Sequence, residues 1–262
     1  MLKTCLYGPV TSWRLGKSIG VDLLSDIKKI CNFDCVYCQI GKTDILINEY
    51  DRKIFVPNDK IFKEIESLGK DLDVDVFTFA GRGEPTLAKN LYDVVNFIKS
   101  IRKEKLVIIT NSMNLYIDEV QKSLENFDIV MAKFDAFDDS MMCKINRPIN
   151  KINPFEKLYN GLLNFGRDYK GSLELQIMFL DNNKSRDVYK NAFEFLKNIG
   201  PDKIYINTPI RPCDVHALTF EEIQNIKNDF CFYFQKHNIL SRKNKNIEII
   251  SVYDRYKNVK LG

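Results

Sequence analysis

Short apolar runs alternate along the chain with longer segments in which apolar residues recur at every third or fourth position. Runs of about 4–8 residues rich in Val, Ile and Phe are typical of buried strands, whereas the longer spacing is typical of helices with one buried face. Because short connections separate these elements, the alternation predicts parallel strands joined by right-handed crossovers. The predicted strands lie at residues 18–24, 74–80, 106–110, 129–134, 173–180 and 203–208.

Capping signals place the helices between these strands. Asn58 begins the first helix, which Gly69 closes, and Pro154 marks the first turn of a later one. Thr219 and Glu222 form a capping box that begins the last helix. Further helices are predicted at residues 91–101, 115–124 and 188–199, and the polar, β-prone segment 44–56 is predicted to be an excursion.

Length and composition fit one globular domain. The chain has 262 residues, of which 45% are hydrophobic and 28% are charged, as in an ordinary α/β domain of this size. We expect a core over residues 1–235 and a basic appendage over 236–262. No basic and apolar leader opens the sequence, and no apolar run approaches the ~20 residues of a membrane helix. We therefore expect a cytoplasmic protein without a membrane segment.

The expected appendage concentrates positive charge. The whole chain has a net charge of +4, and residues 236–260 hold seven Lys or Arg against Glu248 and Asp254. Basic tails can bind the phosphate backbone of nucleic acids, although they are more often solvated surface. Both interpretations stay open.

Three cysteines stand close together in the segment Cys31-Asn-Phe-Asp-Cys35-Val-Tyr-Cys38. A loop this tight can direct three thiolates to one [4Fe–4S] cube, which then keeps one iron without a protein ligand. Structural zinc needs four ligands, and the only histidines of the chain are His216 and His237. A disulfide cannot use three cysteines evenly, and nothing indicates an oxidising compartment. The spacing favours the iron–sulfur cluster over these alternatives.

The C-x₃-C-x₂-C spacing resembles the signature of the radical S-adenosylmethionine (SAM) superfamily, and the resemblance covers roughly residues 8–212. Periodicity alone also allows an open doubly wound sheet, but the resemblance implies an α/β fold with an incomplete (β/α)₆ barrel and a small helical and basic C-terminal appendage. It implies two cofactors: a [4Fe–4S] cluster on Cys31, Cys35 and Cys38, and SAM chelated by the open iron. The implied chemistry is reductive cleavage of SAM to methionine and a 5′-deoxyadenosyl radical, which abstracts hydrogen from a substrate. An electron donor such as flavodoxin or ferredoxin is the implied partner.

Polar residues follow the predicted strands at their carboxyl ends, where the active-site residues of α/β barrels lie. The segment Gly81-Arg-Gly-Glu-Pro85 resembles the family's glycine–glutamate–proline segment, which holds the amino group of SAM, although Arg82 separates the two glycines here. The resemblance implies Tyr37 beside the adenine, Asn111 and Ser112 near the ribose or carboxylate, and residues 207–209 near the adenine. The residues expected to contact SAM are Tyr37, Gly81, Gly83, Glu84, Pro85, Asn111, Ser112, Gln176, Asn207 and Pro209.

Four further residues are candidates for contact with the substrate: Lys133, Asp135, Arg211 and Cys213. The first three either face the substrate or pair with one another, and Cys213 could face the same mouth of the barrel. A second cluster is the less favoured alternative, because scattered cysteines more often pack as small apolar residues. Its ligands would be Cys5, Cys143, Cys213 and Cys231.

Three segments resemble the branch that includes wyosine-type tRNA guanosine synthetases: residues 8–22, Lys133-Phe-Asp-Ala136 and Ile145-Asn-Arg-Pro148. The upstream cysteine set of that branch is missing, since only Cys5 precedes Cys31. The first possible function is a radical SAM enzyme acting on a small molecule or peptide. The second is a tRNA base-modifying enzyme, whose RNA affinity should fall steeply with salt. The third is an iron–sulfur electron carrier or SAM-binding sensor, which should form no 5′-deoxyadenosine.

Overall fold

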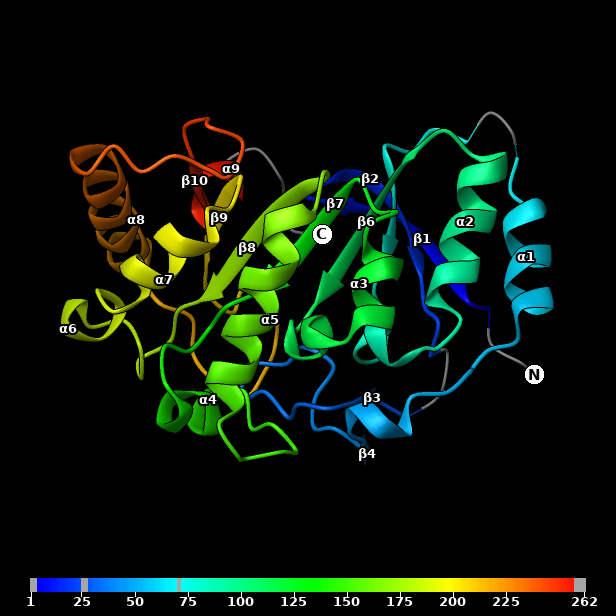
Figure 1. Cartoon of the computed structure of the whole chain (residues 1–262), viewed down its shortest axis with the longest axis horizontal. Coiled ribbons are helices and arrows are strands. Elements are labelled where there is room, and N and C mark those ends of the chain that lie inside the picture. Colours follow the sequence, from blue (N-terminus) through cyan, green and yellow to red (C-terminus); the bar gives the residue numbers. More distant parts are fainter. Residues whose placement is uncertain (1–3, 25–27, 70–71, 257–262) are drawn as a thin grey trace.

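The computed structural model describes residues 4–24, 28–69 and 72–256. In this part of the chain, an eight-stranded sheet has the strand order β1-β2-β5-β6-β7-β8-β9-β10 (Figure 1). Neighbouring strands from β2 onward are parallel, whereas β1 runs antiparallel to β2. The strands of this sheet span Leu6–Ser12 (β1), Gly16–Val21 (β2), Val76–Phe79 (β5), Lys105–Thr110 (β6), Ile129–Lys133 (β7), Ser172–Met178 (β8), Lys203–Asn207 (β9) and Glu248–Ser251 (β10). The predicted mostly parallel α/β sheet is confirmed, with the six predicted strands at β2 and at β5 to β9.

Helices follow the strands and cover one face of the sheet, as Figure 1 shows for α2, α3 and α5. The α-helices span Asn58–Glu66 (α1), Leu91–Ile101 (α2), Asp118–Leu124 (α3), Asp139–Ile145 (α4), Pro154–Asp168 (α5), Arg186–Tyr189 (α6), Ala192–Ile199 (α7), Phe220–Lys236 (α8) and Val252–Tyr256 (α9). Short 3₁₀ helices span Glu49–Asp51 (η1), Pro85–Leu87 (η2) and Met113–Tyr116 (η3). None of the described helices combines the length and apolarity that a membrane span needs.

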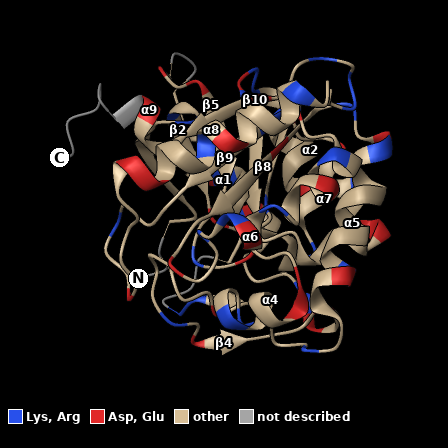
Figure 2. Cartoon of the chain, turned by 90° about the vertical axis from the view of Figure 1, so that its left-hand side faces the viewer, with Lys and Arg blue, Asp and Glu red and all other residues tan. Residues whose placement is uncertain are grey.

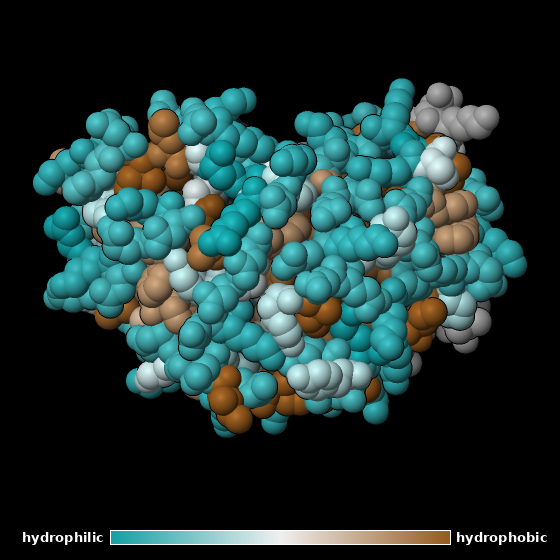
Figure 3. Space-filling model, in the orientation of Figure 1, coloured by the Kyte–Doolittle hydropathy of each residue, from teal (hydrophilic) through white to brown (hydrophobic). Residues whose placement is uncertain are grey.

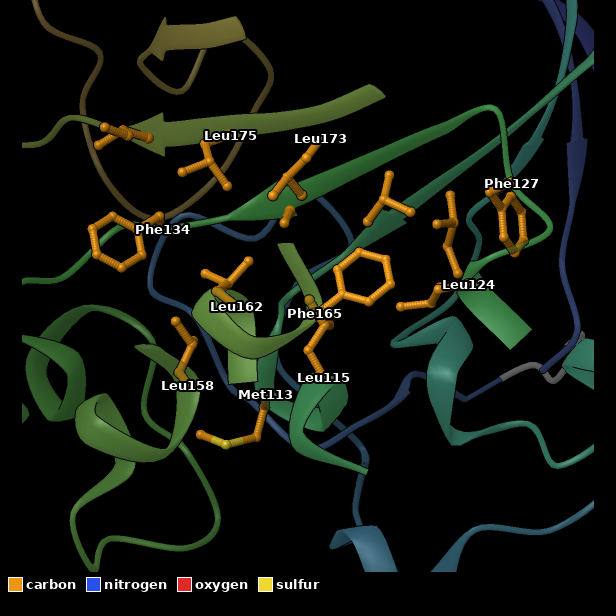
Figure 4. Close-up of a cluster of buried hydrophobic side chains, with 14 of the residues drawn as sticks. Met113, Leu115, Leu124, Phe127, Phe134, Leu158, Leu162, Phe165, Leu173 and Leu175 are labelled. Atoms are coloured by element: carbon orange, nitrogen blue, oxygen red, sulfur yellow. The ribbon is translucent and has the colours of Figure 1, made fainter. Parts of the chain in front are cut away.

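The space between the sheet and the helices is filled by one large apolar core. Figure 4 shows part of it, where Leu162 and Phe165 of α5 lie against Leu173 and Leu175 of β8. Figure 3 shows mainly hydrophilic residues on the outside of this helical face, with hydrophobic residues in small patches. The periodic apolar positions of the helices are therefore buried against the sheet, which gives these helices most of their stability.

The tip of the β1–β2 hairpin fills the other face of the sheet. Leu15 is buried there in a second apolar cluster, which includes Val76, Val107, Met131, Tyr205 and Ile250 from five strands. The ring of Trp13 packs edge-on against Tyr205, with 5.6 Å between the ring centroids. A barrel interior must be filled with side chains, and here the hairpin tip supplies some of them.

Several elements differ from the predictions. The helix expected at 115–124 is divided into η3 and α3, because Ile117 between them has an extended backbone. The helix expected at 188–199 is divided into α6 and α7. Strand β1 was not predicted, because it is largely exposed and contains Gly8-Pro9, so that it forms no apolar run.

The carboxyl-terminal segment is more closely integrated than an appendage. Strand β10 pairs in parallel with β9 and extends the main sheet. Arg242 donates to the carbonyl oxygens of Tyr169 and Gly171 and forms an ion pair with Asp202 at 2.8 Å. Part of the expected appendage is therefore a strand of the sheet, although the division at residue 235 stays a prediction. Residues 1–3, where no leader is predicted, and residues 257–262 lie outside the described residues.

Candidate active site

The cysteine loop, residues 28–47, is fastened to the segment that follows β5. Within it, β3 (Ile30–Cys31) pairs with β4 (Ile45–Leu46) in a small separate sheet. The N–H of Ile30 donates to the carbonyl oxygen of Arg82 at 2.9 Å, and the carbonyl oxygen of Ile30 accepts from the N–H of Glu84 at 3.2 Å. Phe33 forms a further β-bridge to Pro148, after α4. The loop is thus held between two distant parts of the chain.

Gly83 permits the closest approach between these segments. Its φ is +149°, and a Cβ at this position would lie 1.6 Å from the carbonyl oxygen of Ile30. At Gly81, a Cβ would lie 2.1 Å from the carboxylate carbon of Asp22. Any side chain at either position would therefore have to displace its neighbours, and only glycine adopts the backbone of residue 83 without strain.

Nitrogen donors face the sulfur atoms of two cysteines. The Sγ of Cys31 accepts from the N–H of Phe33 at 3.4 Å and from the amide of Asn111 at 3.7 Å. The Sγ of Cys35 accepts from the amide of Asn146 at 3.6 Å. Hydrogen bonds of this kind stabilise negative charge on sulfur.

Burial, in contrast, disfavours the negatively charged thiolate form of these cysteines. It raises the pKa of Cys31, and burial together with the nearby Asp135 carboxylate raises the pKa of Cys35 to about 11. Both thiols therefore keep their protons at neutral pH unless a cation replaces them.

A cavity of about 330 Å³ opens at the carboxyl ends of β7, β8 and β9. Its wall also includes residues 10–14 of the hairpin tip, residues 37–40 of the cysteine loop and residues 207–211 after β9. Cys38, the last of the three clustered cysteines, is part of this wall. The cysteine loop and the strand ends therefore share one cavity.

Six of the residues expected to contact SAM line this cavity. The hydroxyl of Tyr37 donates to the carboxylate of Asp135, and the Lys133 ammonium lies 4.9 Å from the centroid of its ring. Burial and the Asp135 carboxylate raise the pKa of Tyr37 well above its usual value, so that the phenol stays protonated. The lining residues of this set are Tyr37, Gly81, Gly83, Gln176, Asn207 and Pro209.

Glu84 lies behind the wall. Its carboxylate accepts from the hydroxyl of Thr110 and the N–H of Asn111, both at 2.7 Å, and from the hydroxyl of Thr86 at 2.7 Å. Burial raises the pKa of Glu84 although these donors lower it. The resemblance implies that this carboxylate holds an ammonium group, but here it ties the loop after β5 to the end of β6.

Three other residues of the expected SAM set also lie outside the cavity wall. Pro85 is buried at the start of η2. Asn111 directs its amide to Cys31 and to the side-chain oxygen of Asn32, at 2.6 Å from the latter. Ser112, with a φ of +74°, donates its hydroxyl to the carbonyl oxygen of Lys133 at 2.8 Å. Asn111 and Ser112 thus hold the cysteine loop and the ends of β6 and β7 together.

The four substrate candidates also divide into residues that line the cavity and residues that do not. Lys133 lines the cavity and forms an ion pair at 3.1 Å with Asp135, which is buried behind it. Arg211 lines the mouth, where it donates to the side-chain oxygen of Gln39 at 3.1 Å. Cys213 is not part of the wall, and its thiol donates to the carbonyl oxygen of Val215 at 3.3 Å. Contact between Cys213 and the substrate stays a prediction.

The radical SAM superfamily matches residues 27–190. The chain belongs to the radical SAM superfamily. It is 40% identical over 215 residues to a UPF0026 protein of Methanocaldococcus jannaschii, and the match covers 80% of this chain and 64% of that protein. This radical SAM chain thus spans slightly less than two thirds of the length of that relative.

Solved radical SAM structures share the fold. SuiB of Streptococcus suis bound to S-adenosylmethionine has a TM-score of 0.63 at 12% identity, over 90% of this chain and 52% of that one. A structure of TYW1 with a lysine-pyruvate adduct has a TM-score of 0.56 at 13% identity, over 83% of this chain and 74% of that one. The predicted superfamily is therefore confirmed, whereas the wyosine-type branch has only weak support.

The donor set fits the cluster that radical SAM proteins bind. Among the described residues, no three His, Cys, Asp or Glu side chains gather tightly enough to hold a single metal ion. A four-iron cube binds each cysteine at a different iron, so its ligands stand farther apart than those of one ion. Three cysteines on one loop, with amide donors at two of the sulfurs, suit such a cube. The cysteines of the alternative second cluster, Cys5, Cys143, Cys213 and Cys231, do not line this cavity.

Sequence reasoning gave no role to several residues of the site. Trp13 and Arg14 line the cavity from the hairpin tip, and Gln39 lines it from the cysteine loop. Asn146 donates to Cys35 and, at 3.0 Å, to Asp135. Arg14 and Asn146 belong to the segments that resemble the wyosine-type branch, and this resemblance could have identified them as residues of the site. Gln39 directly follows the last clustered cysteine and carries no other signal.

Proposed function

We propose that this chain is a radical SAM enzyme that binds a [4Fe–4S] cluster through Cys31, Cys35 and Cys38 and SAM in the adjoining cavity. The observation that carries the proposal is that Cys38 lies in the wall of a 330 Å³ cavity at the strand ends. When bound, these cofactors supply reductive cleavage of SAM to methionine and a 5′-deoxyadenosyl radical, which abstracts hydrogen from the substrate.

The protein's own residues would bind and orient the ligands of the cavity, and they would exclude water. Gly81 and Gly83 line the cavity, and the missing side chain of Gly83 lets the cysteine loop lie directly against the segment after β5. Trp13 and Leu15 of the hairpin tip pack against apolar side chains of the sheet, which would keep water from this side of the bound cofactors. The amide of Asn146 lies 3.3 Å from the hydroxyl of Tyr37, and with Asp135 it fixes the residue next to Cys38. The site is thus positioned before any ligand enters.

The partners belong to the same proposal. The electron comes from an external donor such as flavodoxin or ferredoxin, and the oxygen-labile cluster requires a reducing, cytoplasmic location. A structure of the neighbour SuiB contains its precursor peptide SuiA, which supports a peptide as one kind of substrate. A tRNA substrate has less support. Figure 2 shows Lys and Arg interspersed with Asp and Glu over one face, and Arg242 of the basic segment is engaged with Asp202.

Electron paramagnetic resonance of the reconstituted protein tests the proposal. Under anaerobic reduction, the protein should show a [4Fe–4S] signal that changes when SAM is added, because the iron without a protein ligand takes up SAM. Cys31→Ala, Cys35→Ala and Cys38→Ala should each lose this response. Cys231→Ala, on α8 and outside the cavity, is the matched control and should keep it. A protein that holds zinc in place of iron, or a signal that SAM does not alter, would contradict the proposal.

A further inference from the structure

We infer that residues 144–153, which we call the back segment because they lie along the cysteine loop outside the cavity, are the docking surface for a small electron-transfer protein with an acidic contact face. The inference rests on the proposed function, because it concerns the partner that reduces the cluster. This partner loses one electron from its own reduced cofactor, and the oxidised cluster gains that electron without any bond being made or broken.

Backbone contacts fix the back segment against the cysteine loop. The N–H of Val36 donates to the carbonyl oxygen of Ile145 at 2.9 Å, and the N–H of Ile149 donates to that of Asn32 at 3.0 Å. Cys35 lies in the stretch of the loop that these two hydrogen bonds enclose. The back segment therefore runs directly beside one of the three cysteines that would hold the cluster.

The back segment presents cations and contains no acidic residue. Its sequence is Lys-Ile-Asn-Arg-Pro-Ile-Asn-Lys-Ile-Asn. Three of its residues are exposed cations: Lys144, Arg147 and Lys151. The nearest exposed carboxylates in sequence are Asp139 and Glu156, on the helices before and after it. A carboxylate closer in space, that of Glu49, is paired with Lys157 at 2.6 Å, so the charge that the segment offers to a partner is positive.

Exposed isoleucines stand between these cations. Ile149 is 38% exposed and Ile152 is 79% exposed. Both line a small hollow, whose wall also includes Asn32 and Phe33, the two residues after Cys31. Figure 3 shows hydrophobic residues at the lower edge of the view, where the chain between α4 and α5 lies in Figure 1. An apolar centre with a polar rim is typical of protein–protein interfaces, whereas RNA is bound mainly by cations and aromatic side chains, so these isoleucines favour a protein partner.

The position of the back segment favours a partner that exchanges electrons rather than atoms. A substrate must reach the cavity at the strand ends, and no residue of the back segment belongs to the wall of that cavity. The segment approaches the cluster ligands from outside, since the amide of Asn146 lies 3.6 Å from the Sγ of Cys35. An electron can cross this short distance while the atoms of the partner stay at the surface. Small, weak interfaces of this kind are typical of electron-transfer complexes.

Stopped-flow reduction of the anaerobically reconstituted chain tests the inference with two kinds of reductant. Photochemically reduced flavodoxin and ferredoxin are the protein probes, and dithionite is a small reductant that needs no docking surface. We expect at least one of the two proteins to reduce the wild-type cluster, at a rate that falls with salt because opposite charges steer the encounter. A wild-type cluster that dithionite reduces and neither protein reduces would overturn the inference.

Two variants with matched controls make the test specific to the back segment. Ile152→Asp and Lys151→Glu should each slow reduction by the protein probe about tenfold or more, through lost apolar contact and reversed charge. The rate with dithionite should change by less than about threefold, because small reductants make no such interface. Ile101→Asp and Lys99→Glu make the same substitutions at exposed positions of α2 and should leave both rates unchanged.

The other outcomes contradict the inference. Equal slowing with dithionite and with the protein probe would mean that the variants act on the cluster itself, and unchanged rates would mean that the partner docks elsewhere. Variants that lose tRNA binding or self-association, but keep the rate with the protein probe, would assign the surface to a nucleic acid or to a second copy of the chain. Each of these results overturns the inference and leaves the proposed function standing, whereas a protein that takes up no [4Fe–4S] cluster overturns the proposed function.

Discussion

The contact between Gly83 and Ile30 fixes the cysteine loop against the end of β5. The two glycines of Gly81-Arg-Gly83 predict that the backbone can approach a ligand closely, whereas the group that lies against Gly83 in the structure is the carbonyl oxygen of Ile30. The partner could not be predicted, because residues 30 and 83 meet only after the sheet has formed. The same holds for Asn146, whose amide reaches Cys35 from the residue after α4, more than a hundred residues away in sequence.

Gly83→Ala should destabilise the protein strongly. The added methyl group would meet the backbone of Ile30, which cannot move without breaking two hydrogen bonds. We expect the free energy of unfolding to fall by about 2–4 kcal/mol, measured by urea denaturation. Gly69→Ala is the matched control, because a Cβ there meets nothing within 4 Å, and it should change stability by less than about 1 kcal/mol. Equal effects of the two substitutions would contradict the contact.

Asn146→Leu should lower the reduction potential of the bound cluster. The substitution removes the amide that donates to Cys35, and a hydrogen bond to sulfur favours the reduced, more negative state. A bond worth about 0.5–1.5 kcal/mol corresponds to a shift of roughly 20–60 mV, which potentiometric titration can resolve. Asn198→Leu, on α7 and outside the cavity, should leave the potential unchanged. An unchanged or higher potential in Asn146→Leu would show that this amide does not act on the cluster.

Among the elements, those with strong local signals match the sequence predictions. The capping box of α8 is present, with Thr219 accepting from the N–H of Glu222 and Glu222 accepting from the N–H of Thr219. The β1–β2 hairpin could not be predicted, because its stability comes from Trp13 and Leu15, which pack on strands far along the chain. Elements with a capping or periodic apolar signal of their own were therefore predictable, and the hairpin, whose anchoring residues pack on distant strands, was not.

The N-terminal cap of α8 should make the stability of the folded protein depend on pH. Hydrogen bonds from Lys184 and Thr219 lower the pKa of Glu222 from 4.5 to about 2. Because the folded pKa lies below the unfolded value, the stabilisation is complete above pH 4.5 and is lost as the pH falls to about 2. Glu222→Gln should therefore be less stable than the wild type at pH 7, and the difference should shrink between pH 4.5 and 2. Urea denaturation between pH 2 and 7 measures this difference in the free energy of unfolding. Glu221→Gln is the control, because Glu221 lacks the contacts to Lys184 and Thr219. A difference that stays constant with pH would show that the carboxylate of Glu222 does not stabilise the fold.

For the whole molecule, β10 and Arg242 join the carboxyl-terminal segment to the sheet. Charge counting predicted only a basic appendage here, because the four residues of β10 form no apolar run and their partner β9 lies about forty residues earlier. The overall parallel arrangement was predictable from the repeat of strands and helices. The last strand was not, because β10 pairs with β9, which becomes the edge of the sheet only after the other strands have assembled.

Arg242→Ala tests this role of the basic segment. The substitution removes the guanidinium that donates to the carbonyl oxygens of Tyr169 and Gly171 and pairs with Asp202, and it leaves Lys243 as a second donor to Gly171. We expect a loss of about 1.5–3 kcal/mol in the free energy of unfolding. Lys245→Ala removes a charge from an exposed position of the same segment and should cost less than about 0.5 kcal/mol. If both variants matched the wild type, the segment would be the solvated appendage that its composition suggests.

The most direct measurement is the formation of 5′-deoxyadenosine by the anaerobically reconstituted, reduced protein in the presence of SAM. The account predicts that the wild type forms this product even without substrate, that Cys38→Ala forms none, and that Cys231→Ala forms as much as the wild type. A wild-type protein that carries its cluster and binds SAM but releases no 5′-deoxyadenosine would contradict the account, and would identify the chain as an electron carrier or a SAM sensor.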